Sequence, residues 1–225
     1  MSSARPGTAL EREPTASGIA RRKTDLIVLA VATVVLALST LAAKAALSDA
    51  EVGVFRAVND LPRGLYTAIW PVMQYGTFIT IPILALVALV FRRFRLALAL
   101  LLAGVGVYLL AIVIKPIVDR GRPAALLTGV QGRETFGEGS LGYPSGHAAV
   151  AGALTVVVAA HLSTRWAIAA LVLGIAVLVG RMYVGAHLPL DLIGGAALGA
   201  VAGSVVNLLI RPAPKAPPPP GPTPS

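Results

Sequence analysis

The chain has 225 residues, 56% of them hydrophobic, and a mean hydropathy of +0.80, which is more apolar surface than one soluble core can bury and indicates an integral membrane protein. The absence of cysteine excludes a disulfide framework, a thiolate metal site and thiol chemistry. The net charge of +9 comes from basic residues in short segments between apolar runs, which favours anionic lipid headgroups over nucleic acid as partners.

The first 24 residues carry small, polar and basic side chains without an apolar period, which predicts a disordered cytoplasmic tail. An apolar run follows from about Leu26 to Leu47, long enough at about 1.5 Å per residue to cross a hydrocarbon core of about 30 Å. A cleavable signal peptide is the alternative interpretation, but its apolar region is usually only about 7 to 15 residues long. We therefore expect this run to be the first transmembrane helix.

Five further apolar runs predict five more membrane spans. The sequence therefore predicts an all-α, polytopic membrane protein with six transmembrane helices within residues 25–211, followed by a disordered Pro-rich tail at 212–225. The fourth and fifth runs are short, so we expect them to recruit a helical turn from neighbouring polar residues. The five runs are Tyr66–Phe91, Leu96–Ile114, Ala148–Leu162, Trp166–Gly180 and Leu188–Ile210.

Between the first two spans, Val52, Phe55 and Val58 recur at a spacing of three. This pattern predicts a short interfacial helix within residues 49–63, with these three side chains facing lipid. An ordinary loop fits so short a pattern equally well.

Basic residues outside the predicted spans indicate the orientation, because Lys and Arg concentrate in short cytoplasmic loops. With the N-terminus inside, eleven of them fall in cytoplasmic segments and seven on the opposite side. We therefore expect a multi-pass protein of the cell membrane with both termini in the cytoplasm.

Three short polar segments interrupt the apolar sequence: Lys115–Pro123, Pro144–His147 and Arg181–Asp191. A charged side chain within a bilayer costs about 2.5 to 3.5 kcal/mol on insertion scales, so this concentration of charge needs a compensating function. The predicted orientation places all three segments on the non-cytoplasmic side, where they can form one site. Their combined inventory of cations, histidines and a carboxylate suits phosphate chemistry.

In the third polar segment, His187 and Asp191 are four residues apart at the start of the sixth span, and Pro189 suits the first helical turn. On a helix the two side chains share a face, so the carboxylate can fix the tautomer of the histidine, whose other nitrogen can then attack phosphorus. A structural capping pair at a helix start is the alternative.

In the second polar segment, Pro144, Ser145 and Gly146 predict a turn into the fourth span, where backbone N–H groups and the helix dipole favour an anion. His147, in the first helical turn, is placed to donate a proton to a leaving oxygen. A turn without function has the same composition and is the alternative.

Lys115 and Arg122 of the first polar segment are seven residues apart, about two helical turns, and Arg181 ends the fifth span. Three such cations can neutralise a phosphate and stabilise its transition state. For Arg120, Arg133 and Arg165 we favour the simpler interpretation that they extend from the membrane interface toward water.

The spacings K-x6-R-P, P-S-G-H and R-x5-H-x3-D, in this order, resemble the type 2 phosphatidic acid phosphatase superfamily, also called lipid phosphate phosphatases, over about Tyr66–Ile210. One departure is Gly180, where the third motif of that family usually has serine. The resemblance implies a six-helix membrane fold, no metal or other cofactor, and a phosphohistidine. It implies these site residues: His187 as nucleophile, Asp191 as its orienting carboxylate, His147 as general acid, and Lys115, Arg122, Ser145, Gly146 and Arg181 as phosphate contacts.

The sequence therefore predicts hydrolysis of a lipid phosphate or diphosphate on the non-cytoplasmic face, with membrane lipids rather than nucleic acid as surroundings. Short outer loops favour a polyprenyl diphosphate such as undecaprenyl diphosphate, by analogy with minimal bacterial enzymes. Phosphatidic acid and phosphatidylglycerophosphate are the alternative substrates. A non-catalytic lipid-phosphate binder or flippase is the alternative of another class, and a vanadium-dependent haloperoxidase is disfavoured because those enzymes are soluble.

Overall fold

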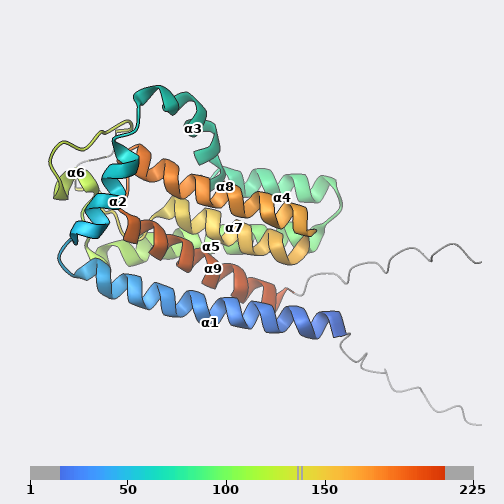
Figure 1. Cartoon of the computed structure of the whole chain (residues 1–225). Helices are drawn as coiled ribbons and strands as arrows, with labels where there is room; N and C mark the ends of the chain where they lie inside the picture. The colour runs from blue at the N-terminus through green and yellow to red at the C-terminus, as the bar shows by residue number, and fades with distance from the viewer. Residues whose placement is uncertain (1–15, 136, 138, 211–225) are drawn as a thin grey trace, which may run out of the picture.

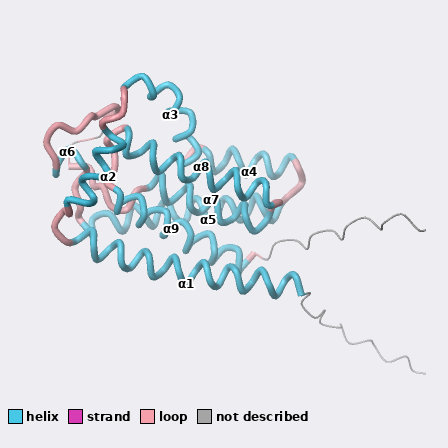
Figure 2. Tube along the Cα trace, viewed as in Figure 1, coloured by secondary structure: helices cyan, strands magenta, loops and turns pink. Residues whose placement is uncertain are grey.

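A computed structural model describes residues 16–135, 137 and 139–210, and in this part of the chain all regular structure is helical (Figures 1 and 2). The predicted all-α fold is thereby confirmed. Two 3₁₀ turns, Arg63–Leu65 and Gln74–Gly76, flank α3. The helices are α1 (Ala16–Lys44), α2 (Asp49–Asn59), α3 (Tyr66–Met73), α4 (Thr80–Val90), α5 (Phe94–Val118), α6 (Pro123–Leu126), α7 (Gly146–His161), α8 (Thr164–Tyr183) and α9 (Pro189–Leu209).

The long helices lie side by side in one bundle (Figure 1). At one end α2, α6 and the loops around them gather, and the two ends of the described chain lie at the other. Because successive long helices run in opposite directions, the end of α5, the start of α7, the end of α8 and the start of α9 all meet at the end that carries α2. This arrangement brings the three polar segments together.

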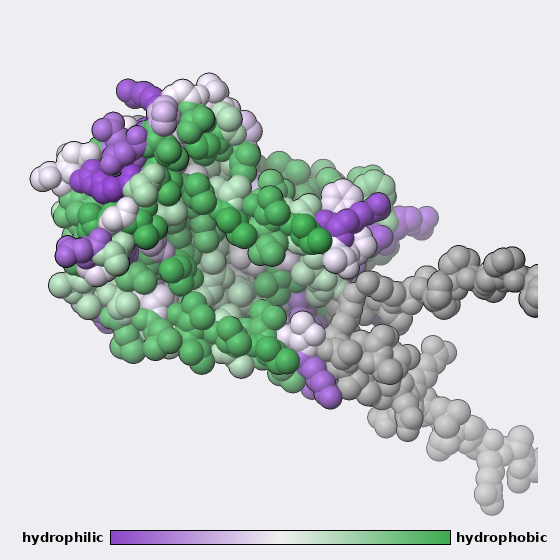
Figure 3. Space-filling view, viewed as in Figure 1, coloured by the Kyte–Doolittle hydropathy of each residue, from purple (hydrophilic) through white to green (hydrophobic). Residues whose placement is uncertain are grey.

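Apolar side chains cover most of the visible lateral surface of the bundle, and polar ones gather toward its ends (Figure 3). Among the described residues, four helices are long and apolar enough to cross a membrane: α1 from Arg22 onward, α5, α8 and α9. The number rises to five if the bent pair formed by residues 63–76 and α4 counts as one span. As predicted, α7 and α8 extend into polar residues, but α7 still has only 16 residues, or about 24 Å. Six spans therefore remain a prediction.

The predicted second span is not one continuous helix. It breaks between α3 and α4, which are bent by 68°. Thr77 is extended at the break, and the hydroxyls of Thr77 and Thr80 donate to the carbonyl of Gln74 at 2.7 and 2.5 Å. The same carbonyl accepts a hydrogen bond of 3.0 Å from the backbone N–H of Thr77, so the two hydroxyls add to a backbone contact and stabilise the break.

Small residues allow α7 and α9 to pack closely. Gly195, Gly199 and Gly203 recur every four residues on one face of α9, and a Cβ atom on any of them would meet α7 or the residue before it. Such glycine spacing lets two membrane helices approach backbone to backbone. The close contact fixes the start of α7 against the start of α9, where two of the polar segments lie.

The segment between α1 and α3 forms the helix α2, so the loop alternative is wrong. Its apolar face is not turned to lipid as predicted, because Phe55 is fully buried. Glu51, Phe55 and Asn59 are spaced four apart and all face the protein. The amide of Asn59 donates to the carbonyls of Met182, Gln131 and Tyr183, and these polar contacts hold the face inward. α1 begins at Ala16, within the predicted N-terminal tail, so it starts earlier than expected. Residues 1–15 of that tail and the predicted Pro-rich tail at 212–225 lie outside the described part.

Candidate active site

His187 and Asp191 lie together where the loop after α8 enters α9, and both side chains are buried. Nδ1 of His187 is 3.6 Å from Oδ2 of Asp191, close enough for a charge interaction but longer than a hydrogen bond. The same Oδ2 accepts a hydrogen bond of 2.9 Å from the backbone N–H of Leu188, the N-cap of α9. Asp191 therefore caps the helix, as one interpretation of the sequence held, while its carboxylate also faces the histidine.

Burial holds the pKa of His187 well below its usual value, and the positive charges of Arg122, Arg181 and Lys115 lower that pKa further. A backbone hydrogen bond with Gly142 acts in the opposite direction and is the weakest of these influences. The lowered pKa favours the neutral imidazole. A neutral imidazole has the lone pair that attack on phosphorus requires.

The second polar segment forms the start of α7. Ser145 is the N-cap, and its buried hydroxyl accepts a hydrogen bond of 3.4 Å from the backbone N–H of Ala148. The N–H of Ser145 donates to the carbonyl of Asp191 at 2.9 Å, which ties the starts of α7 and α9 together. A Cβ atom on Gly146 would meet no other atom within 4 Å, so open space adjoins the first turn. Backbone N–H groups at such a helix start favour an anion.

His147 follows in the first turn of α7, and its side chain is only partly buried. It interacts electrostatically with His187, Arg122, Arg181 and Lys115. The fold thus brings both histidines and the three predicted phosphate-binding cations together from three segments that are far apart in the sequence.

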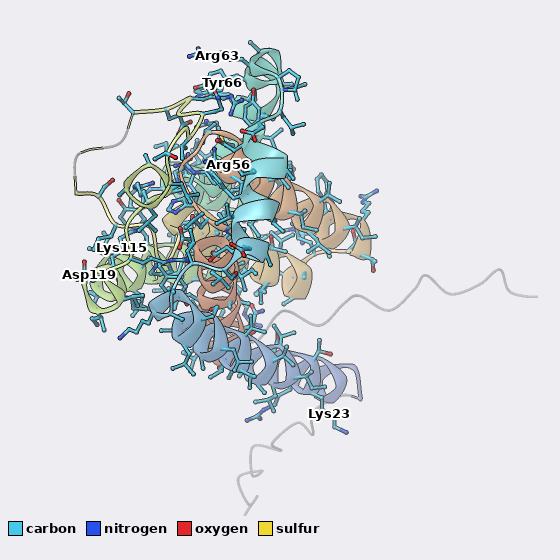
Figure 4. All side chains as sticks on the ribbon, turned by 60° about the vertical axis from the view of Figure 1, so that its left-hand side comes forward. Lys23, Arg56, Arg63, Tyr66, Lys115 and Asp119 are labelled. Carbon is cyan, nitrogen blue, oxygen red and sulfur yellow. The ribbon has the colours of Figure 1, made fainter. Side chains whose placement is uncertain are left out.

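Lys115 lies in the last turn of α5, at the end of the bundle that also carries Arg56 of α2 (Figure 4). Its ammonium donates to three carbonyl oxygens, at 3.0 Å to Leu141, 3.4 Å to Gly142 and 3.0 Å to Pro144. An ammonium group has three donors, so these contacts use all of them. Lys115 therefore holds the turn before α7, and a direct phosphate contact requires one of these bonds to be exchanged.

The two predicted phosphate-binding arginines lie near each other. Arg122 donates from Nε to the hydroxyl of Ser140 at 2.7 Å and from a terminal nitrogen to the carbonyl of Ala186 at 3.0 Å. Arg181 forms an ion pair of 2.7 Å with Glu134. Burial and the neighbouring charge of Arg181 lower the pKa of Arg122. Because guanidinium groups stay charged in proteins, this proximity creates a strongly positive region beside His187.

Arg120 does not extend toward water, as the sequence interpretation had it, but is buried in the protein interior and only 6% exposed. It donates to Asp191 at 3.1 Å and to both carboxylate oxygens of Glu51 at 3.1 and 2.6 Å. Burial acts against the charged form of Arg120, but the two carboxylates outweigh it and raise the pKa of this guanidinium. Arg120 is therefore part of the site that the sequence analysis missed.

The same correction applies to Arg133. It donates to the carbonyls of Asn59 at 2.8 Å, Leu61 at 2.6 Å and Tyr183, and its guanidinium lies 4.0 Å from the centre of the Tyr183 ring. These contacts fasten the loop before α7 to α2 and to the end of α8. Arg165 is exposed at the start of α8, and its place at the membrane interface stays a prediction.

The departure at Gly180 has a packing explanation. A Cβ atom at this position would lie 2.5 Å from Cγ of Met73 and 3.1 Å from Cγ2 of Ile69. A serine would therefore require Met73 to move. The side chain of Met73 is buried and fills the space that a residue larger than glycine would occupy.

A helical membrane fold with two histidines and three cations at one end is the arrangement expected of a membrane phosphatase. The chain belongs to the PAP2 superfamily, whose family model matches residues 92–214 and so includes α5 to α9 and all three polar segments. The family resemblance inferred from the motifs is thereby confirmed.

Two solved structures have a similar fold. Aquifex aeolicus LpxE is 24% identical with a TM-score of 0.63, and the match covers 69% of this chain and 93% of LpxE. A transmembrane PAP2-type phosphatidylglycerolphosphate phosphatase from Bacillus subtilis is 19% identical with a TM-score of 0.56, and the match covers 86% of this chain and 95% of that phosphatase. At these identities the similarity establishes the fold. No curated protein sequence matches the chain.

Proposed function

We propose that the protein hydrolyses a lipid phosphate or diphosphate through a phosphohistidine formed on His187. The observation that carries this proposal is the gathering of Lys115, Arg122 and Arg181 around two histidines, one of which faces a buried carboxylate. The cations are suited to bind phosphate oxygens, and the neutral imidazole is suited to attack phosphorus. A lipid-phosphate binder or flippase needs the cations but has no use for this pair of histidines.

In the proposed reaction, Nε2 of His187 forms a bond to phosphorus, because Nδ1 faces Asp191. The bond from phosphorus to the leaving oxygen breaks, and His147 donates a proton to that oxygen. In the second step water attacks the phosphohistidine and gives a proton to His147, which releases inorganic phosphate and restores His187. The two steps together hydrolyse one phosphorus–oxygen bond.

Positive charge for the transition state comes from side chains in this proposal. Arg122 and Arg181 bind phosphate oxygens, together with the hydroxyl of Ser145 and the backbone N–H of Gly146, and Lys115 acts through its charge. We therefore propose that the reaction needs no metal ion. Among the residues that the structure describes, no three His, Asp or Glu side chains are grouped so as to hold one.

For the substrate we propose a polyprenyl diphosphate such as undecaprenyl diphosphate, taken from the non-cytoplasmic leaflet. This choice rests on the outer loops as the sequence predicts them, by analogy with minimal bacterial enzymes. Phosphatidylglycerophosphate is the second candidate, because the fold is similar to that of the Bacillus subtilis phosphatase. Phosphatidic acid shares the same phosphate chemistry and belongs in the same test.

Phosphate release from the detergent-solubilised protein, measured in EDTA with these three lipids, tests the proposal. We expect release from at least one lipid, the highest kcat/KM for the polyprenyl diphosphate, and no release by His187→Ala. Arg165→Ala is the matched control, since it removes an exposed charge outside the three polar segments. Release that survives in His187→Ala, or that requires added Mg²⁺, would contradict the mechanism.

A further inference from the structure

A buried chain of charges links Asp191 to a carboxylate outside the three polar segments. One terminal nitrogen of Arg120 donates to Oδ1 of Asp191 and to Oε1 of Glu51, each at 3.1 Å, and the other donates to Oε2 of Glu51 at 2.6 Å. The side chains of Arg120, Glu51 and Asp191 are 6%, 5% and 0% exposed. Glu51 belongs to α2, which precedes the region that the family model matches.

Glu51 also holds the start of α9. Its Oε1 accepts a hydrogen bond of 3.0 Å from the backbone N–H of Leu190. Glu51 is itself fixed, because its backbone N–H donates to the N-cap hydroxyl of Ser48 at 3.2 Å. The position of Glu51 therefore determines where both Arg120 and the first turn of α9 lie.

The charges of this cluster matter for the histidine beside it. Asp191 paired with Arg120 alone would form a neutral couple, and the guanidinium would compete with His187 for the carboxylate. Glu51 engages both terminal nitrogens of Arg120, so two carboxylates and one guanidinium leave one net negative charge next to His187. Burying such ions costs several kcal/mol each, and apolar replacements of buried ion pairs are often no less stable, so stability alone is a weak reason for this cluster.

We propose that Glu51 is a positioning residue: acting through Arg120, it fixes the carboxylate of Asp191 and balances the charge of Arg120, so that Asp191 presents its negative charge to His187. This inference rests on the proposed function, in which His187 is the nucleophile. Positive charge develops on the imidazole as Nε2 bonds to phosphorus, and Nδ1–H faces Asp191. A carboxylate that keeps its charge stabilises this state.

Charge variants test the inference through the pH dependence of kcat/KM. Glu51→Gln makes the surroundings of His187 more positive, so the acid limb should move to lower pH, whereas Arg120→Gln makes them more negative and should move it to higher pH. We expect shifts of about half a pH unit or more in each direction, and a return toward the wild-type limb in the double variant. The other groups that face or interact with His187 stay unchanged in all variants: Asp191, His147, Arg122, Arg181 and Lys115.

The size of the effect distinguishes positioning from substrate binding. We expect Glu51→Gln to lower kcat and the rate of phosphoenzyme formation by about tenfold, with KM within about twofold. Asp49→Asn, an exposed acidic neighbour in the first turn of the same helix, is the matched control and should behave like wild type. A residue that only stabilises the fold would lower the amount of active enzyme without moving the acid limb.

Each outcome decides between the two proposals. Wild-type activity that is lost in His187→Ala but unchanged in Glu51→Gln, or acid limbs that move in the same direction in both single variants, overturns this inference alone. A wild-type protein without phosphatase activity overturns the proposed function and this inference with it. If Glu51→Gln does not accumulate in membranes, Arg120→Gln and the double variant provide the same comparison.

Discussion

Arg181 donates a hydrogen bond of 2.7 Å to Oε2 of Glu134, a residue of the loop between α6 and α7. The arginine is only 4% exposed and belongs to the set expected to bind phosphate, so a protein carboxylate engages a donor that the substrate would use. Phosphate and carboxylate oxygens accept from guanidinium groups in the same geometry. In the proposed reaction the substrate therefore has to compete with Glu134 for Arg181.

We expect Glu134→Gln to lower KM about three- to tenfold and to leave kcat within about twofold, because the neutral amide competes less well for Arg181. Initial rates over a range of lipid phosphate concentrations measure this, and the inhibition constant of inorganic phosphate should fall in parallel. Asp60→Asn is the control, since Asp60 is exposed at the end of α2. A rise in KM would mean that Glu134 helps to bind the substrate instead.

The pKa of His187 lies well below the usual histidine value of about 6.5. We therefore expect the acid limb of kcat/KM, where activity falls as His187 takes up a proton, to lie below pH 6.5. His187 must be neutral to attack, and because burial lowers its pKa, the neutral form persists as the pH falls below 6.5. The same shift predicts a loss of stability below about pH 6.5, where the unfolded chain binds a proton that the folded chain does not. Rates and thermal unfolding measured from about pH 4 to 8 test both statements. An acid limb at or above pH 6.5 would show that His187 is more exposed than the structure has it.

The fold was largely predictable because apolar runs and helix boundaries are local features of the sequence. Five of the six apolar runs became continuous helices, and the run Tyr66–Phe91 became helical on both sides of a break. The extension of α8 to Tyr183 followed from treating Arg181 as part of the helix. The break between α3 and α4 was not predicted, because it involves hydrogen bonds from the hydroxyl groups of Thr77 and Thr80 to one carbonyl. Mean hydropathy carries no information about such a contact.

The site was predictable where residues interact along one segment, and not where they interact between segments. The spacing of His187 and Asp191 already predicted that the two would face each other. The role of Arg120 depends on Glu51, which is 69 residues earlier in the chain. The residues next to Arg120 and Glu51 in the sequence do not indicate that these two side chains form a pair. An arginine in a buried ion pair and an arginine that extends into water therefore look the same in the sequence. Glu134 was missed for the same reason.

We predict six spans, with the active site on the non-cytoplasmic side and both termini in the cytoplasm. The fold supports this topology, because the two ends of the described chain lie at the opposite end of the bundle from α2 and the site (Figure 1). The chain has no cysteine, so single cysteines report without background. Gly137→Cys in the loop before α7 should react with a membrane-impermeant maleimide from outside, and Ala216→Cys, which lies outside the described residues, only after permeabilisation. Labelling of both from the same side would refute the topology.

The last prediction is that the two histidines differ in kind. Attack by His187 forms the covalent bond, so His187→Ala should abolish both turnover and any acid-labile phosphoenzyme. His147 protonates the leaving oxygen in the proposed reaction. His147→Ala should therefore lose about 10² to 10⁴ in rate with a lipid phosphate, but far less with an aryl phosphate whose acidic phenol leaves without a proton.

Rapid quenching with radiolabelled substrate separates the two roles. The aryl phosphate should give a trapped phosphoenzyme in wild type and in His147→Ala, and none in His187→Ala. His161→Ala is the matched control, because His161 ends α7 at the opposite end of that helix from His147. A phosphoenzyme that persists in His187→Ala would overturn the assignment of the nucleophile. Equal rescue of His187→Ala and His147→Ala by the aryl phosphate would overturn the assignment of the general acid, since only a missing proton donor is compensated by a leaving group that needs no proton.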